Sequence, residues 1–264
     1  PDERFAEDYL RVLRALRFAG RFRLAIEPRT WEALVAATPN LTRLSAERIR
    51  EELWKILAGT WRASAALALY AASGALRVLY PELEASIGLR APGARHDAFT
   101  ESLLAVDSLP PARPLLRAAA LLVAAARVAD SGTPQRDPEA GARAAAAVMQ
   151  RLKASRAETE RVTRLVRTHG DAVPLDAGDP AVRRWLRRVG PDLVRDHARL
   201  TIAFWRARSG EAAVPAPAPV GADPPARLRA PAGAAGEVLE RWRRARAVLR
   251  TRPPLAVSDL AIGG

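Results

Sequence analysis

The chain has 264 residues, of which 49% are hydrophobic, and it contains no cysteine. This composition suffices for a sizeable buried core, and it excludes a disulfide framework, a thiolate zinc site and a cysteine nucleophile. The formal net charge is +13. Such a basic chain predicts a polyanionic partner, with nucleic acid as the first candidate and an anionic membrane surface as the second.

The composition also predicts an all-α fold. Only 5% of the residues are aromatic, while the abundant alanine, leucine and arginine all favour helices. The longest apolar run, around residues 118–126, is too short to span a bilayer. We therefore expect no membrane association, and the lack of cysteine favours a cytoplasmic location.

Periodicity and turn residues predict helices along the whole chain. The first is expected over residues 3–19, ended by Gly20. A second begins at Pro28, and a third over residues 46–58 takes Ser45 as its N-cap. Later helices are expected over residues 61–72, 96–107, 114–129, 138–154, 157–168, 180–189, 191–208 and 236–250. Residues 212–234 are rich in proline, alanine and glycine, which predicts a flexible loop.

One short segment combines acidic residues with arginine at helical spacing. Glu7 and Asp8 precede Arg11 by four and three residues, so on one helix they would be neighbours. A carboxylate beside a planar guanidinium can read the Watson–Crick edge of a base. Taken alone, the segment is better interpreted as an exposed helix with ordinary charge pairs, which are common and weak.

The surrounding sequence favours the first interpretation. Glu7-Asp8-x-x-Arg11, continued by Leu-Arg14-Ala-x-Arg17-Phe18-Ala19, resembles the neck of class II (bacterial) tRNA nucleotidyltransferases and poly(A) polymerases, and so do residues 47–57. The resemblance implies that Asp8 and Arg11 pair with the base of CTP or ATP. It also implies roles for their neighbours: Glu7 orients Arg11, Arg14 supports the site, and Arg48 and Glu52 brace the helix as polar struts. Plain solvated charges are an equal alternative for Arg48 and Glu52.

The resemblance also implies a domain organisation. A neck over residues 1–59 would precede a degenerate HD-like helical body over residues 60–175 and a helical tail over residues 176–264. The family's catalytic head, which uses Mg²⁺, has a glycine-rich phosphate loop and paired aspartates, and the sequence contains neither pattern. We therefore predict no catalytic residue in this chain and no activity of the chain alone. ATP and CTP are implied as substrates of the enzyme, without a cofactor in this segment.

The body resembles a metal-dependent phosphohydrolase domain that has lost its ligands. Val123 and Ala124 occupy the places of a His-Asp pair, and Glu101 and Asp137 occupy the places of two further histidines. A metal site needs several converging ligands, so we predict no metal site here. The three histidines, His96, His169 and His197, are interpreted as ordinary surface or helix-end residues.

Two arginine-rich segments near the C-terminal end predict contacts with RNA. They mix cations with Trp185 and Trp242, which suits a phosphate backbone with stacking beside it. A solvated helix face with tryptophan in the core is an equal alternative. The predicted RNA-binding residues are Arg183, Arg184, Arg187, Arg188, Arg243 and Arg244.

The resemblance implies tRNA and nucleotides as partners and CCA addition to tRNA 3′ ends as the function. A poly(A) polymerase of the same family and a non-catalytic helical RNA-binding adaptor are the alternatives. The intact Glu7-Asp8-x-x-Arg11 pattern favours a nucleotide-selecting role over the adaptor.

Overall fold

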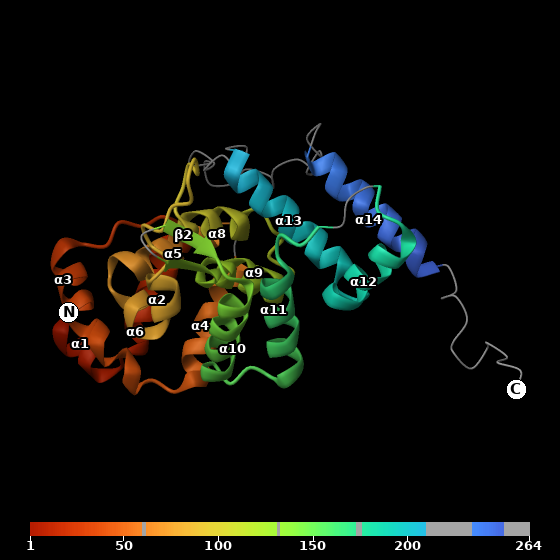
Figure 1. Cartoon of the computed structure of the whole chain (residues 1–264). Coiled ribbons are helices and arrows are strands. Elements are labelled where there is room, and N and C mark those ends of the chain that lie inside the picture. Colours follow the sequence, from red (N-terminus) through yellow and green to blue (C-terminus); the bar gives the residue numbers. More distant parts are fainter. Residues whose placement is uncertain (60–61, 131–132, 173–175, 210–233, 251–264) are drawn as a thin grey trace, which may run out of the picture.

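The computed structural model describes residues 1–59, 62–130, 133–172, 176–209 and 234–250, and helices form most of these ranges (Figure 1). The chain begins with α1 (Asp2–Glu7), α2 (Leu10–Phe22), α3 (Pro28–Ala37), the 3₁₀ helix η1 (Thr38–Arg43) and α4 (Ala46–Gly59). The middle contains α5 (Ala63–Ala72), α6 (Ala75–Leu79), α7 (Pro81–Glu84), α8 (Ala98–Asp107), α9 (Pro114–Leu122), η2 (Val123–Ala126), α10 (Pro138–Arg151) and α11 (Arg156–Thr168). The last described helices are α12 (Asp179–Val189), α13 (Val194–Ser209) and α14 (Ala234–Arg250). The predicted all-α class is confirmed.

Side-chain caps explain where several helices begin. The Glu27 carboxylate accepts hydrogen bonds from the backbone amides of Arg29 and Thr30 at the start of α3. Ser155 and Glu158 form a reciprocal capping box at the start of α11. Such caps satisfy backbone donors that have no partner within the helix. The predicted helices in the second half of the chain agree with the observed ones to within a few residues.

The predicted first helix is wrong in two respects. The chain leaves the helical conformation at Asp8, whose φ of −155° and ψ of 105° are extended, so α1 and α2 are separate helices. Gly20 does not end α2, because the helix continues to Phe22 and is closed by Arg23 in the left-handed conformation. A Cβ atom on Gly20 would lie 2.4 Å from the Ala66 backbone. Glycine at this position therefore allows α2 to pack closely against α5.

The sequence did not predict two short helices and a pair of strands. Helices α6 and α7 were missed, and the expected helix over residues 114–129 ends early. After η2 the chain forms an antiparallel pair of strands, β1 (Arg127–Asp130) and β2 (Thr133–Arg136). The predicted loop at 212–234 lies outside the described residues, except for its last residue, which begins α14.

A continuous hydrophobic core runs from Phe5 in α1 to Val248 in α14. It also contains a few buried charges with specific partners. The fully buried guanidinium of Arg117 donates hydrogen bonds to the backbone carbonyls of Val106 and Leu57, at 2.9 and 2.5 Å. These bonds join α9 to the ends of α8 and α4. They also satisfy the buried guanidinium, because buried polar groups need hydrogen-bond partners.

Helix α13 is attached to the middle of the molecule at both of its ends. Near its start, the buried carboxylate of Asp196 accepts hydrogen bonds from Arg113 at 3.2 Å and from Arg161 at 2.5 Å. Near its end, Arg208 forms an ion pair with the buried Glu101 of α8 at 3.1 Å. Figure 1 shows α13 running between the central helices and α12 and α14, so this helix connects the two groups.

Candidate nucleic-acid interface

The predicted nucleotide-selecting residues lie at the break between α1 and α2. At this break Asp8 is held from two sides. Its Oδ1 accepts a hydrogen bond from the Leu10 amide at 3.0 Å, and its Oδ2 accepts one from Arg48 at 2.9 Å. Partial burial opposes ionisation of Asp8, but these hydrogen bonds outweigh it and lower the pKa of the carboxyl. Asp8 is therefore a fixed, ionised acceptor with free lone pairs on both oxygens.

Arg11 is fixed along one edge of its guanidinium. Its Nη1 donates to the Glu7 carboxylate at 2.6 Å and to the Arg4 carbonyl at 2.7 Å. Its Nε and Nη2 donors have no hydrogen-bond partner among the described residues. The hydrogen bond from Arg11 lowers the pKa of Glu7, so this carboxylate stays charged and keeps the arginine in place. Glu7 therefore lies where the predicted orienting role requires it.

Asp8 and Arg11 do not form an ion pair with each other in the described structure. Their spacing predicts neighbours on one helix. The break at Asp8 instead gives each side chain a different partner. Both side chains are partly accessible, with exposed fractions of 34% for Asp8 and 41% for Arg11. The acceptor Asp8 and the partly unpaired guanidinium of Arg11 therefore lie three residues apart in the sequence, and each is held by another side chain.

Helix α4 braces this region through the two predicted struts. Arg48 reaches Asp8 at the break, as described above. Glu52 is buried, and its carboxylate accepts hydrogen bonds from Arg17 Nε at 2.6 Å and from Lys55 Nζ at 2.9 Å. Burial opposes the charge on Glu52, but both cations outweigh it and lower its pKa. Arg17 could not be identified from spacing as the partner of Glu52, because the two residues are 35 positions apart.

Arg14 begins a row of arginines and phenylalanines along α2 that sequence reasoning missed. Arg14 is exposed, and its guanidinium lies 6.0 Å from the ring centre of Phe18. Phe18 stacks on Phe22 at 6.0 Å, and Arg21 lies over the Phe22 ring at 5.3 Å. The i, i+4 spacing of the two phenylalanines was the available signal.

The predicted RNA-binding arginines differ in how freely they are presented. Arg184, Arg187, Arg188 and Arg243 are exposed, whereas Arg183 and Arg244 are half-buried. Arg188 forms an ion pair with Asp171 at 3.1 Å, and Arg244 donates to the Ala177 carbonyl. The basic residues thus lie on α12 and α14, and their contact with RNA stays a prediction.

The two tryptophans of these segments are not open stacking platforms. Trp185 is buried and meets His197 edge to face at 5.4 Å, and Trp242 packs partly buried against the core. Tryptophan in the core is therefore the correct alternative for Trp185.

A narrow cavity of about 10 Å³ lies in the region that the sequence predicts to be HD-like. It brings together three of the four positions singled out by sequence, Glu101, Val123 and Ala124, and adds His169. Asp137 does not line it, because its carboxylate caps α10 by accepting from the Glu139 and Ala140 amides. The volume is about that of one water molecule, and Glu101 is engaged by Arg208.

The described residues offer no candidate metal site and no candidate membrane span. They contain no group of three or more His, Cys, Asp or Glu side chains placed to hold a metal ion. None of the helices in the described ranges combines the length and the apolar character needed to cross a membrane.

Comparisons with known proteins single out the N-terminal part of the chain. Residues 23–87 match the family model described as "Probable RNA and SrmB- binding site of polymerase A". This range contains Arg48 and Glu52, and it begins after Asp8 and Arg11.

Several CCA-adding enzymes are similar over a comparable length. The enzyme of Leuconostoc mesenteroides is 46% identical over 59 residues, which are 22% of this chain and 15% of the relative. The enzyme of Streptococcus suis is 48% identical over 63 residues, which are 24% of this chain and 16% of the relative. The enzyme of Geobacillus kaustophilus is 41% identical over 88 residues, which are 33% of this chain and 21% of the relative. The alignments therefore cover less than a quarter of each relative.

A solved structure of a CCA-adding enzyme in complex with CTP superposes on 77% of this chain and 44% of that chain. The TM-score is 0.43 and the sequence identity is 21%.

Proposed function

We propose, from the tRNA nucleotidyltransferase and poly(A) polymerase family that the family model and the aligned relatives support for this chain, that it selects nucleotides and holds tRNA in a CCA-adding enzyme. The observation that carries the proposal is the presentation of Arg11. Glu7 and the Arg4 carbonyl fix one edge of its guanidinium, while Nε and Nη2 have no partner among the described residues. Beside it, Arg48 and the Leu10 amide fix the acceptor Asp8.

This pair of groups suits cytosine and adenine. Each of these bases carries an amino group that can donate to Asp8 and a neighbouring ring nitrogen that can accept from Arg11. Guanine and uracil present a ring N–H where Arg11 needs an acceptor, so two donors would face each other. A correct bidentate contact is worth about 1–3 kcal/mol of discrimination. Because the acceptor and donor are held in advance, little conformational entropy is lost when a base binds.

Nucleotide transfer itself requires groups that the described residues do not offer. The family resemblance assigns Mg²⁺ to a catalytic head, and the described residues hold no cluster of acidic or histidine ligands that fits a metal ion. The proposed contribution of this chain is the selection of CTP and ATP and the retention of the RNA.

The charge of the chain supports retention of tRNA. A protein with a net charge of +13 releases condensed counterions when it covers phosphates, so its affinity falls steeply with salt. The family resemblance implies tRNA as the substrate of the aligned CCA-adding enzymes, which favours folded tRNA over other polyanions as the ligand of this chain. A poly(A) polymerase is the second candidate, because the description of the matched family model names polymerase A.

The proposal is tested by equilibrium binding of CTP, ATP, GTP and UTP to the chain. We expect tighter binding of CTP and ATP, and we expect Asp8→Ala and Arg11→Ala each to reduce that preference about 5- to 150-fold. Arg77→Ala is the control, since Arg77 is exposed on α6 and its ionic partner among the described residues is Glu84. A preference for ATP alone favours the poly(A) polymerase, and a preference unchanged in both variants contradicts the selecting role.

A further inference from the structure

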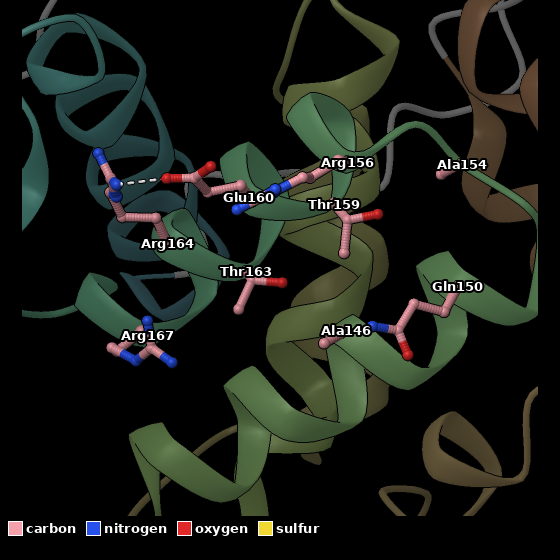
Figure 2. Close-up of a pocket in the computed structure, with 9 residues that line it drawn as sticks. All are labelled: Ala146, Gln150, Ala154, Arg156, Thr159, Glu160, Thr163, Arg164 and Arg167. Carbon is pink, nitrogen blue, oxygen red and sulfur yellow. Dashed lines mark hydrogen bonds and ion pairs between the residues drawn. The ribbon is translucent and has the colours of Figure 1, made fainter.

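A groove of about 580 Å³ lies between α10 and α11, away from the nucleotide-selecting residues of α1 and α2 (Figure 2). Figure 2 shows Thr159 and Thr163 of α11 across from Ala146 and Gln150 of α10. Three arginines and one carboxylate complete the polar lining: Arg156, Arg164, Arg167 and Glu160. No residue of this groove is among those predicted from the sequence.

The α10 side of the groove leaves it open. Ala146 offers only a methyl group, and the next turn adds Gln150, whose side chain is exposed. Because no larger side chain covers the space between the helices, a ligand can approach the α11 side directly. The groove has no aromatic lining residue, so it provides no surface on which a base could stack.

The α11 side carries cations that a ligand can reach. Arg156 is exposed and forms no ion pair among the described residues. Arg164 pairs with Glu160 at 2.7 Å and Arg167 with Glu139 at 2.9 Å, and both pairs are largely solvent-exposed. Exposed pairs of this kind are weak, so a phosphate that accepts two hydrogen bonds from an arginine can replace either carboxylate.

The buried wall of the groove contains one unsatisfied polar atom. The Thr163 hydroxyl is buried and has no hydrogen-bond partner in the described structure. An unpaired buried hydroxyl costs free energy, and a small movement of the side chain would offer it to a ligand in the groove.

The arginines extend over a length that suits a strand of nucleic acid. Arg156 and Arg167 are eleven residues apart on α11, which corresponds to about 16 Å along the helix. A single phosphate would engage one end of such a row, whereas consecutive phosphates can engage both. Arginine also binds phosphate oxygens through two parallel hydrogen bonds.

We infer that the α10–α11 groove binds the phosphate backbone of RNA without reading its bases. The inference rests on the proposed function, because it names the surface of the body on which the tRNA is held. Recognition is by phosphates alone, so binding here depends on salt and does not depend on sequence.

The test compares two double variants that lose the same charge. Arg156→Ala with Arg167→Ala removes both ends of the groove, and Arg90→Ala with Arg95→Ala removes two exposed arginines outside it. Binding of fluorescent tRNA is followed by anisotropy across a salt series. We expect the groove variant to bind at least about tenfold more weakly and its salt slope to fall by about 1.4–1.8, since each of the two phosphate contacts contributes about 0.7–0.9. The control should show less than half of either change.

A third variant tests the shape of the groove with all arginines in place. Ala146→Trp fills the space across from Thr159 and Thr163, and we expect it to weaken tRNA binding while circular dichroism and the thermal midpoint stay unchanged. If this variant loses stability, Ala146→Gln offers a smaller obstruction, with a correspondingly smaller loss expected.

The outcomes separate the inference from the proposed function. If the chain binds tRNA, but the groove variants bind like the control, the groove inference is wrong and the proposed function stands. If the unmodified chain shows no preference for tRNA over heparin, both the retention of tRNA and the groove inference fail.

Discussion

Arg17 Nε donates a hydrogen bond of 2.6 Å to Glu52 Oε2, and both side chains are buried in the contact between α2 and α4. The pair joins α2, the helix that carries Arg11, to α4, the helix that carries Arg48. Removing Arg17 leaves the buried Glu52 carboxylate with the half-exposed Lys55 as its remaining cationic partner among the described residues, which costs more than an exposed pair contributes.

Arg17→Ala is therefore expected to lower the free energy of unfolding by about 3–5 kcal/mol, as measured by urea denaturation. Replacing both partners together, by Arg17→Met and Glu52→Leu, should recover most of the loss because no buried charge remains. Lys55→Ala is the matched control, since Lys55 contacts the same carboxylate but is half exposed; its loss should stay below about 1 kcal/mol. Equal losses from Arg17→Ala and Lys55→Ala would contradict the special role of the buried pair.

We expect the free energy of unfolding to fall in mild acid because of the buried His197. Burial lowers the pKa of its imidazole below the usual 6.5, against the hydrogen bond to the Thr168 carbonyl and the nearby Asp171. The unfolded chain then binds a proton near pH 6.5 that the folded chain does not bind. Stability is therefore complete above about pH 6.5 and falls as the pH drops towards the lowered folded-state pKa.

Unfolding by urea at about pH 7.5 and 5.5 measures this effect. His197→Gln removes the titrating group, so its stability should change less between the two pH values than that of the unmodified chain. The Glu52 carboxyl does not interfere, because its pKa lies below 4.5. An identical pH dependence of both proteins would show that His197 is not responsible.

Gly20→Ala is expected to destabilise the contact of α2 with α5. The new Cβ atom would lie 2.4 Å from backbone atoms of Ala66, which cannot move aside without shifting a helix. Overpacking of this kind costs about 1–3 kcal/mol, measurable by thermal or urea unfolding. At Gly59 the nearest atom is the flexible end of Arg21, 3.9 Å away, so Gly59→Ala should be neutral or stabilise by up to about 1 kcal/mol. A Gly20→Ala protein as stable as Gly59→Ala would contradict the close approach.

The body cavity is expected to lack metal-dependent phosphohydrolase activity. Val123 and Ala124 line it and cannot coordinate a metal, and Glu101 is engaged by Arg208. Phosphomonoesters and cyclic phosphodiesters incubated with nickel, cobalt or manganese should therefore remain intact. Turnover that a chelator abolishes would show that another set of ligands operates.

Helix positions were predictable where local chemistry decides them. Ser155 followed by Glu158 begins α11 through a capping box, and proline in the first turn of α10 is a local signal of the same kind. The break at Asp8 was missed although its carboxylate accepts locally from the Leu10 amide. The second hydrogen bond of Asp8, from Arg48 forty residues away, could not be predicted from spacing. Gly20 was misjudged for a related reason: its function is the approach of Ala66 from another helix.

The candidate site shows the same division. Spacing identified Glu7 and Arg11, which lie within one turn of each other, and their contact at 2.6 Å follows from it. Sequence spacing could not reveal that Arg17 rather than a solvated charge is the partner of Glu52. Nor could it reveal the α10–α11 groove, because an empty volume depends on which faces of two helices meet.

The two attachments of α13 bear on how the molecule comes apart. Asp196 connects the start of this helix to Arg113 and Arg161, and Arg208 connects its end to Glu101. A polypeptide that stops at residue 175 would lose both attachments and expose the side chains that α13 covers. The central helices and α13 should consequently melt in one cooperative transition, and we expect no separate unfolding step at the predicted boundary between body and tail.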